Sequence, residues 1–305
     1  MGPYLYFSFI VSLLLIGTLF NREHVELLST LQLIVIVLFV GLRHEVGFDY
    51  EAYRNPYELN QIKEIVDIFS LNQHFETGFS LFQNLLNFGR IPFNINLLII
   101  ALISIGAKQF AIRKLTFQNL IPIYFYLAYF VLDFEMGIIR QSLALGVSLV
   151  GYSFYLSDKK KVGIIILVFA VMFHKSLFLF LFLPLISDKK MTKEEFVIIL
   201  SVSFIFLLLD LNYYFVELVK LIGETLPSSN FSNKIISYSE LKRYSYKVKF
   251  KWGFVSLLMF AFCGFYYSNK INALNFNRFF RTFMIGGLMG TYTFSNFAVL
   301  TRFSL

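Results

Sequence analysis

The chain has 305 residues, of which 57% are hydrophobic and only 15% are charged, and its formal net charge is +8. Soluble globular domains carry about 25% charged residues, so this composition, with a mean hydropathy of +0.67, excludes an ordinary soluble protein. Apolar runs that approach the roughly 20 residues of a membrane-crossing helix predict an all-α, polytopic membrane protein. In such a protein, excess Lys and Arg set membrane topology, so the positive charge does not indicate a nucleic-acid partner.

The N-terminal part is predicted to hold two spans and a polar outer loop. Tyr4–Phe20 is interpreted as a membrane helix and not as a cleaved signal peptide, because Arg22 follows the apolar run instead of preceding it. The second span is Leu27–Val40. Residues 43–93 then form a predicted outer loop with amphipathic segments, and their charge is acidic overall.

Short loops rich in Lys and Arg mark the cytoplasmic side of a membrane protein. Three such loops are predicted, at Lys108–Lys114, Lys159–Lys161 and Lys189–Lys193. Asn94–Ile112 runs inward to the first of them. Two spans, Leu120–Leu132 and Ile138–Leu156, then connect the first loop with the second, so the hinge near Asp133, Phe134 and Glu135 is predicted to face outward.

The apolar run Val162–Ile186 is long enough for one span, but both of its flanks are lysine-rich. Parity therefore favours two short segments that turn at His174, Lys175 and Ser176. Short, polar-interrupted segments of this kind point to binding sites in membrane proteins. The alternative is a single tilted helix with Lys175 in lipid, at a cost of about 2.5–3.5 kcal/mol on insertion scales.

Towards the C-terminus, the same rule predicts three more spans. Phe196–Leu209 runs outward. Trp252–Tyr267 returns inward, which places Arg278 and Arg281 on the cytoplasmic side. Phe283–Leu300 runs outward and leaves Arg302 at the outer face.

The segment 212–251 is predicted to be an outer loop although it is strongly basic. Either the topology is wrong by one crossing at this point, or the loop attracts an anionic ligand. With about ten spans, short and re-entrant ones included, and no repeat or linker, residues 1–305 are predicted to form a single domain.

Several ionisable side chains from different segments are predicted to meet at the outer surface, and intramembrane ionisable groups usually mark function. Arg140 lies at the start of a span rich in small residues. A guanidinium group binds phosphate bidentately and keeps its charge, so Arg140 is a candidate anion clamp; the alternative is an arginine that extends to the interface. Arg43 and Arg302, each at a helix end, allow the same two interpretations, and Tyr53 is a candidate contact to a sugar or a headgroup.

Three residues are candidates for a general base, which must reach the proton and have a suitable pKa. They are Asp49, Glu76 and His174. The alternative for the two carboxylates is a solvated loop position, and for His174 a hydrogen-bonded buried histidine. The sequence contains no GxxxxGK[ST], GxGxxG or HExxH motif, so neither a cofactor nor a metal is expected. An anionic, lipid-linked substrate with a phosphate leaving group fits this set best.

Four stretches also resemble, in order, the EpsG family of exopolysaccharide polymerases, which are related to the Wzy O-antigen polymerases. They are "RHEVGFDYEAY" (43–53), "FETGFSLFQNLL" (75–86), "IRQSLALGVSL" (139–149) and "FHKSLFLFLFLPL" (173–185). The positions that match the family pattern are Arg43, Gly47, Asp49, Tyr50, Tyr53, Glu76, Gly78, Arg140, Gln141, His174 and Ser176.

The resemblance implies a multi-pass glycosyltransferase of the bacterial inner membrane, with a fold similar to the GT-C class. It would polymerise undecaprenyl-pyrophosphate-linked oligosaccharide repeat units outside the cytoplasm, into exopolysaccharide or O-antigen, with membrane lipid and a chain-length regulator as further partners. Gln141 joins the expected substrate-binding residues through this resemblance. Family members often continue for one or two helices beyond Arg302, so a C-terminally shortened copy is expected. Two other functions stay open: a flippase or transporter of lipid-linked glycans, and a membrane O-acyltransferase or ligase acting on surface polysaccharide.

Overall fold

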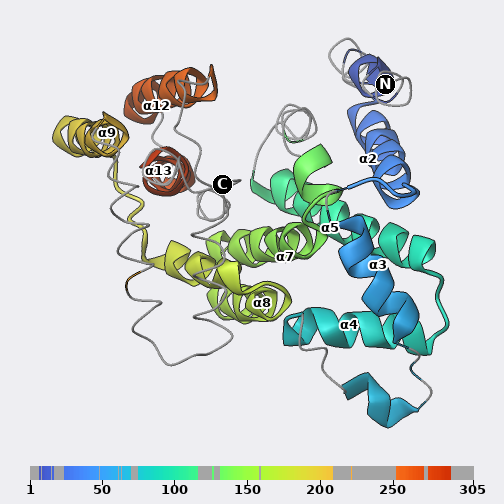
Figure 1. Cartoon of the computed structure of the whole chain (residues 1–305). Helices are drawn as coiled ribbons and strands as arrows, with labels where there is room; N and C mark the ends of the chain where they lie inside the picture. Colours follow the sequence, from blue (N-terminus) through green and yellow to red (C-terminus); the bar gives the residue numbers. More distant parts are fainter. Residues whose placement is uncertain are drawn as a thin grey trace. The chain divides into compact units, whose positions relative to one another are not determined.

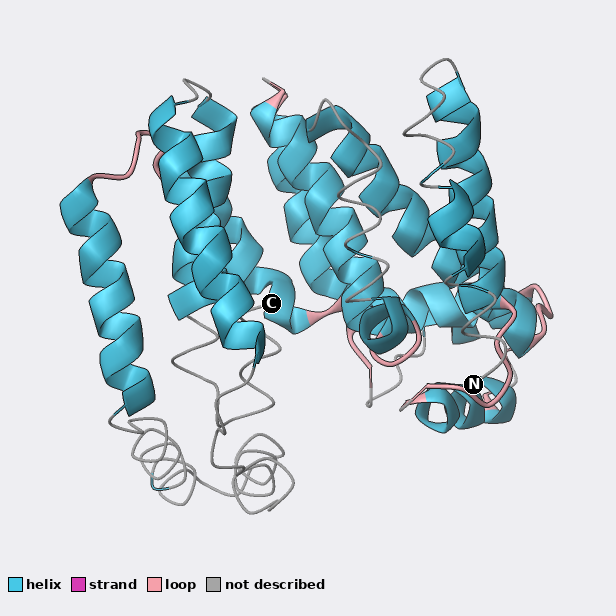
Figure 2. Cartoon of the chain, turned by 90° about the horizontal axis from the view of Figure 1, so that it is seen from above, coloured by secondary structure: helices cyan, strands magenta, loops and turns pink. Residues whose placement is uncertain are grey.

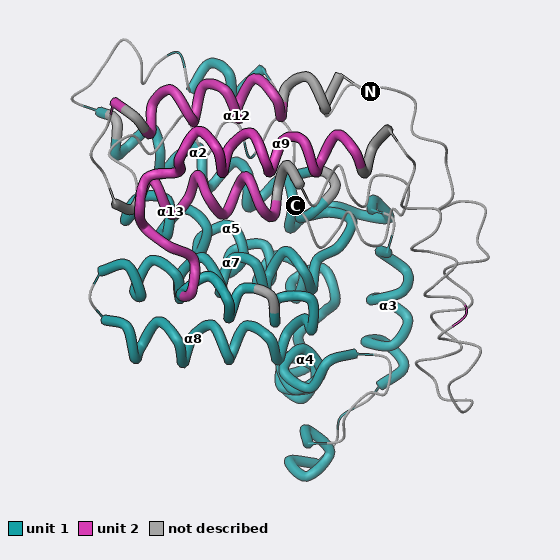
Figure 3. The backbone as a smooth tube through the Cα atoms, turned by 90° about the vertical axis from the view of Figure 1, so that its left-hand side faces the viewer, with its two compact units in different colours: residues 1–184 teal, residues 185–305 magenta. Residues whose placement is uncertain are grey.

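The structure is a computed structural model of the whole chain (Figure 1). It describes residues 7, 9–14, 16, 24–47, 49–60, 62, 64–69, 75–115, 126, 131–157, 159–208, 221, 252–270 and 274–289. Within these residues every regular element is helical and there is no strand (Figure 2), which confirms the predicted all-α class. The chain divides into two compact units, Met1–Pro184 and Leu185–Leu305 (Figure 3). The single domain therefore stays a prediction.

Unit 1 contains the N-terminal helices and most of the predicted site. Its described elements are α2 (Val25–Gly41), α3 (Tyr50–Leu59), the 3₁₀ helix η2 (Ile65–Phe69), α4 (Thr77–Phe88), α5 (Phe93–Leu115), the π-helix η3 (Val131–Glu135), α7 (Ile139–Leu156), α8 (Lys160–Phe173) and the 3₁₀ helix η4 (Lys175–Leu185). By length and composition, α5 is the one helix among the described residues that could cross a membrane; shorter apolar stretches occur at Glu26–Gly41, Lys175–Leu185 and Leu257–Ser268. The predicted count of about ten spans therefore stays a prediction.

Helices α5 and α7 pack in the same direction. Near its middle, α7 approaches α5 so closely that a Cβ on Gly146 would lie 2.7 Å from the Ser104 carbonyl oxygen. Further along both helices, the rings of Phe110 and Phe154 stack with their centroids 6.1 Å apart. Residue numbers thus rise together along the two helices. In the predicted topology both helices run inward, and one outward span, Leu120–Leu132, connects them. That topology requires α5 and α7 to be parallel.

The break predicted at His174 is confirmed. Helix α8 ends at Phe173, His174 is extended (φ −157°, ψ 120°), and η4 begins at Lys175. The segment then returns, because Tyr155 of α7 lies against Gly163 near the start of α8 and also hydrogen-bonds the Pro184 carbonyl (3.4 Å). Eleven residues suffice for this return: at about 2 Å per residue a 3₁₀ helix of that length covers about 22 Å, close to the roughly 21 Å of a 14-residue α-helix.

Helix α4 crosses the end of α8. Figure 3 shows α4 nearly end-on, whereas α7 and α8 run across the view. The contact depends on a glycine, because a Cβ on Gly78 would lie 2.8 Å from the carbonyl oxygen of Met172 in the last turn of α8. A core of buried side chains from α3, α4, α5, α7, α8 and η4 holds this end of the unit together: Tyr50, Tyr53, Tyr57, Phe79, Phe93, Leu97, Ile100, Ile139, Leu143, Ala144, Phe173 and Leu177.

Unit 2 contains α9 (Lys193–Leu208), α12 (Trp252–Lys270), α13 (Leu274–Thr282) and the π-helix η6 (Phe283–Met289) among its described residues. Arg281 donates to Glu195 (2.8 and 3.2 Å) and to the carbonyls of Lys189 and Lys190. Two segments predicted on the same side, 189–193 and the Arg281 region, are therefore in contact. The basic loop 212–251, apart from Leu221, and Arg302 lie outside the described residues.

One topological assignment was wrong. The sequence predicts that Lys108 belongs to a cytoplasmic loop, but it lies inside α5 and is only 2% exposed. Glu135, assigned to an outward-facing hinge, is 3% exposed and forms an ion pair with Lys108 (2.8 Å). A buried charge is tolerated when an opposite charge and hydrogen bonds compensate it, so neither residue reports the position of a membrane surface.

Candidate functional site

The centre of the candidate site is the side chain of Arg140, the second residue of α7. Its Nη1 donates to Oε2 of Glu76 (2.6 Å) and its Nε donates to the hydroxyl of Tyr53 (3.2 Å). The side chains of Arg140 and Glu76 are 23% and 15% exposed, so the ion pair is half-buried and keeps some access to solvent. Of the candidates predicted from the sequence, the structure brings these three into direct contact.

Aromatic rings surround the guanidinium group. Its central carbon lies 4.9 Å from the ring centroid of Phe75 and 5.6 Å from that of Tyr53. The rings of Tyr53, Phe75 and Phe79 contact one another, with centroids 5.4–5.9 Å apart. Ring faces attract a cation most when it is partly desolvated, so this cluster fixes the orientation of Arg140. The two phenylalanines were not predicted as site residues.

The local sequence explains how Glu76 reaches Arg140. Glu76 is the N-cap residue of α4 (φ −66°, ψ 149°), yet its side chain makes no capping hydrogen bond. N-cap positions usually hold short side chains that bond to the first turn. The longer glutamate instead extends to α7, while Gly78 allows α4 to pack closely on α8. The carboxylate is thus held for Arg140 and not for the helix end.

Tyr53 comes from α3 and is 5% exposed. Burial raises the pKa of its phenol, and the charge of Arg140 opposes that shift. Tyr53 therefore stays protonated at neutral pH and accepts a hydrogen bond from Arg140 as a neutral group.

A second glycine fixes the loop before α3 against the start of α7. Gly47 has φ +116°, a region that side chains other than glycine rarely adopt, and a Cβ at this position would collide with the Met136 carbonyl. Arg43, in the same loop, is 7% exposed and donates to the carbonyls of Val40 (2.9 Å) and Val46 (3.1 Å). Burial lowers the pKa of Arg43 to about 10, and the charge of Glu135 opposes that shift, so Arg43 is cationic at neutral pH.

The remaining candidates occupy different positions. Asp49 is half-buried and begins α3 without a side-chain capping hydrogen bond. Gln141 is buried in α7 (9% exposed). His174 lies between α8 and η4, where its Nδ1 contacts the Ser176 backbone N–H (3.2 Å) and hydroxyl (2.7 Å). Arg302 lies outside the described residues, so its predicted role stays a prediction, as do the roles of the others.

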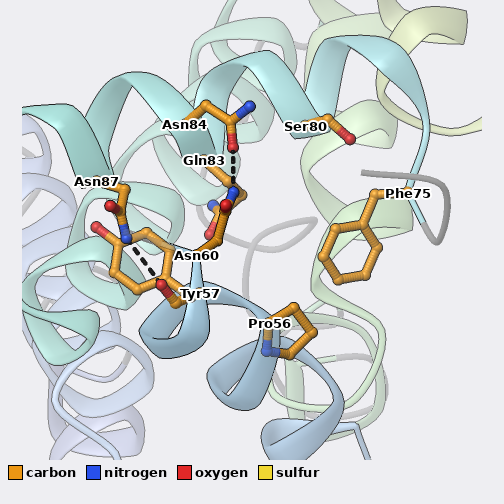
Figure 4. Close-up of a pocket in the computed structure, with 8 residues that line it drawn as sticks. All are labelled: Pro56, Tyr57, Asn60, Phe75, Ser80, Gln83, Asn84 and Asn87. Atoms are coloured by element: carbon orange, nitrogen blue, oxygen red, sulfur yellow. Dashed lines mark hydrogen bonds between the residues drawn. The ribbon is translucent and has the colours of Figure 1, made fainter. Parts of the chain in front are cut away.

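A pocket beside the site is lined by amide side chains (Figure 4). Asn60 of α3's C-cap donates to Asn84 (3.0 Å), and Asn87 donates to the Tyr57 carbonyl (2.7 Å). These bonds tie α3 to α4 and so hold Tyr53 next to Glu76. Phe75 lines this pocket and also packs on Arg140, so the pocket adjoins the Arg140 site.

A buried polar network, missed in the sequence, lies between α5 and α7. The Lys108 Nζ donates to Glu135 (2.8 Å) and to the hydroxyls of Ser104 (2.7 Å) and Ser142 (2.9 Å), and Tyr126 donates to the same Glu135 oxygen (2.5 Å). Glu135 ends the π-helix five residues before Arg140. The available signal was a pair of opposite charges, each inside an apolar run.

Among the residues that the structure describes, no group of three or more His, Cys, Asp or Glu side chains could hold a metal ion. In comparisons with known proteins, the family model of the EpsG family matches residues 26–305. The match includes every candidate named above. No curated protein and no solved structure matches the chain.

Proposed function

The chain belongs to the EpsG family, and on this premise we propose that it is a membrane polysaccharide polymerase that joins lipid-linked oligosaccharide repeat units. The substrate class is undecaprenyl-pyrophosphate-linked oligosaccharide, used at the outer face of the bacterial inner membrane, which the chain crosses several times. The residue pattern and the hydropathy support this assignment. The observation that carries it is the half-buried Arg140, which keeps some access to solvent and is already paired with a carboxylate.

The proposed reaction moves a growing glycan from its lipid carrier to a new unit. The bond between the anomeric carbon and the pyrophosphate oxygen breaks, and the pyrophosphate leaves with the bonding electrons. A hydroxyl oxygen of the acceptor sugar forms the new bond to that carbon and gives its proton to a base. Negative charge thus develops on the pyrophosphate, and a fixed donor placed there is usually the largest catalytic contribution. Arg140 is suited to this role, since guanidinium recognises phosphate through paired N–H donors.

Glu76 occupies the position on Arg140 that a phosphate would take. When pyrophosphate binds the guanidinium group, the Glu76 carboxylate is released next to the reacting atoms and can accept the proton of the acceptor hydroxyl. Asp49, at the start of the helix that carries Tyr53, is the other carboxylate proposed for this step. Phe75 is partly exposed and offers a ring face on which a sugar can pack, while the buried Tyr53 contributes its hydroxyl, which accepts from Arg140.

Purified protein in liposomes that contain lipid-linked repeat units tests the proposal. The wild type is expected to give a ladder of glycan lengths. Arg140→Ala is expected to lower the rate by about 10²–10³-fold, the usual effect of removing one such donor, and Arg140→Lys is expected to lie between the two. Arg54→Ala is the control, because the ion pairs of Arg54 among the described residues are with exposed carboxylates on α3 and in the loop before it.

Three results would contradict the proposal. A full ladder from Arg140→Ala would remove the assigned role of that residue. Translocation of the lipid-linked unit without a ladder would indicate a flippase. Attachment of a finished polymer or of an acyl group, with no change in chain length, would indicate a ligase or an O-acyltransferase.

A further inference from the structure

His174 lies between the end of α8 at Phe173 and the start of η4 at Lys175, and its ring caps the second helix. The first N–H groups of a helix have no partner inside it, and an N-cap side chain accepts a hydrogen bond from the second or third of them. With His174 as N-cap, Lys175 and Ser176 are the first two residues of η4. The Ser176 N–H points to Nδ1 of His174 at 3.2 Å. The imidazole thus takes the place of the usual Ser, Asp or Asn.

This contact fixes the tautomer of the neutral ring. A backbone N–H can only donate, so Nδ1 of His174 must be the acceptor and carry a lone pair. In a neutral imidazole the proton then lies on Nε2, which becomes the donor. The Ser176 hydroxyl, 2.7 Å from the same nitrogen, donates to it as well. The lone pair that a general base would use is therefore directed at Ser176.

The position of His174 places this donor at the end of the bundle that carries Arg140. Ile139 and Phe173, the residues that precede Arg140 and His174, lie in the same buried core. Helices α4 and α8 touch where Gly78 meets the carbonyl of Met172. Glu76 is two residues before Gly78 and His174 is two residues after Met172, so both lie close to this contact. The ring also sits in a break between two helices, where backbone geometry fixes it.

We propose that His174 binds the pyrophosphate of the lipid-linked substrate through its Nε2–H, as a neutral hydrogen-bond donor, and does not act as the base. This inference rests on the proposed function. It leaves proton abstraction to Glu76 or Asp49, and it gives Arg140 a neutral partner for the leaving group. Arg140 and His174 come from different parts of the chain, so together they can bind a pyrophosphate through more donors than the guanidinium group alone provides.

Three substitutions of His174 distinguish the role of Nδ1, which caps η4, from the role of Nε2, which donates to the ligand. His174→Asn keeps an acceptor near the Nδ1 position and so keeps the cap, but its side chain is too short to donate from the Nε2 position. His174→Gln places an amide N–H near Nε2 and loses the cap. His174→Ala loses both. Ser176→Ala is the matched control, because it removes the hydroxyl and leaves the backbone N–H that fixes the tautomer.

The probe is undecaprenyl pyrophosphate itself, bound to the purified full chain in nanodiscs, with thermal unfolding measured in parallel. We expect His174→Gln and Ser176→Ala to bind the probe with nearly wild-type affinity. We expect His174→Asn and His174→Ala to bind it about 10–100-fold more weakly, the usual effect of losing a hydrogen bond to a charged group. The melting temperature should depend on the cap instead: His174→Asn should melt close to the wild type, and His174→Gln and His174→Ala should melt at lower temperatures.

Wild-type affinity in His174→Asn would show that the ring is only a cap and would overturn the inference. The inference would also be overturned if His174→Gln bound the probe as weakly as His174→Ala does. If all three His174 variants bound with wild-type affinity but formed no polymer, His174 would be a base and not a binding residue. ¹⁵N NMR of histidine-labelled protein, assigned through His174→Gln, must show an unprotonated Nδ1. If the wild type binds the probe with this pattern but forms no ladder, the polymerase assignment fails and the donor role stands.

Discussion

Replacing Lys108 by Met leaves a buried carboxylate without its counter-charge. The side chains of Lys108 and Glu135 are 3% and 2% exposed, and their charged atoms are 2.8 Å apart. Removing one partner of a buried pair costs about 3–5 kcal/mol. Tyr126 and Ser104 still donate to Glu135 in the variant, so we expect a value near the lower end, about 3 kcal/mol. At about 2–4 °C per kcal/mol, the melting temperature should fall by about 6–12 °C.

Thermal unfolding of the purified protein in detergent measures this loss. Lys114→Met is the control in the same helix, because Lys114 is exposed and lies over the ring of Phe154, a contact of about 0.5–1 kcal/mol at most. The double variant Lys108→Met/Glu135→Gln should recover most of the loss, since glutamine still accepts from Tyr126 and no charge remains buried. If Lys108→Met lowers the melting temperature no more than Lys114→Met does, the two charges are not paired in the folded protein.

Glycine substitutions give three further predictions, each read from the melting temperature. Gly146→Ala should destabilise the protein, because the added Cβ would lie 2.7 Å from the Ser104 carbonyl and would push α7 away from α5. Gly106→Ala in α5 should instead stabilise it by about 0.5–1 kcal/mol, because nothing lies within 4 Å of that Cβ; equal shifts in the two variants would contradict the close packing. Gly47→Ala should lower both the melting temperature and glycan synthesis, since a positive φ and the Met136 carbonyl both oppose a side chain there. A Gly47→Ala protein that unfolds and polymerises as the wild type does would show that this loop is not held against α7.

The sequence predicted those features that depend on local hydropathy and on the sign of charges. The turn at His174 could be found because lysine-rich flanks on both sides of one apolar run allow only an even number of crossings. The break between α8 and η4 lies where this argument placed it. The common location of Tyr53, Glu76 and Arg140 was expected from the same crossing count, and they are in direct contact.

Features that depend on tertiary pairing could not be predicted in this way. Lys108 reads as a loop residue because its partner Glu135 is 27 positions away, and nothing in the sequence near either residue shows that the charges meet. Phe75 reads as an ordinary apolar residue, yet its ring lies 4.9 Å from the guanidinium carbon of Arg140. The sequence suggests that Arg43 is a free cation, although two of its donor groups bond to carbonyls of Val40 at the end of α2 and of Val46 in its own loop. For Lys108, Phe75 and Arg43 alike, the packing of the helices determines which group each side chain contacts.

The pairing of Arg140 with Glu76 gives the proposed site a way to select its ligand. A membrane surface is crowded with phospholipids whose phosphodiester carries one negative charge. Such a headgroup would replace a carboxylate of equal charge that is already held 2.6 Å from Nη1, and it would lose translational freedom on binding. A pyrophosphate diester carries two charges and more acceptor oxygens, so it can displace Glu76 and also engage N–H groups that Glu76 and Tyr53 leave unused. Under the proposed function, Glu76→Gln should therefore bind singly charged lipids more readily than the wild type does, and competition between phosphatidylglycerol and undecaprenyl pyrophosphate measures this. Unchanged competition in that variant would show that Glu76 does not guard Arg140.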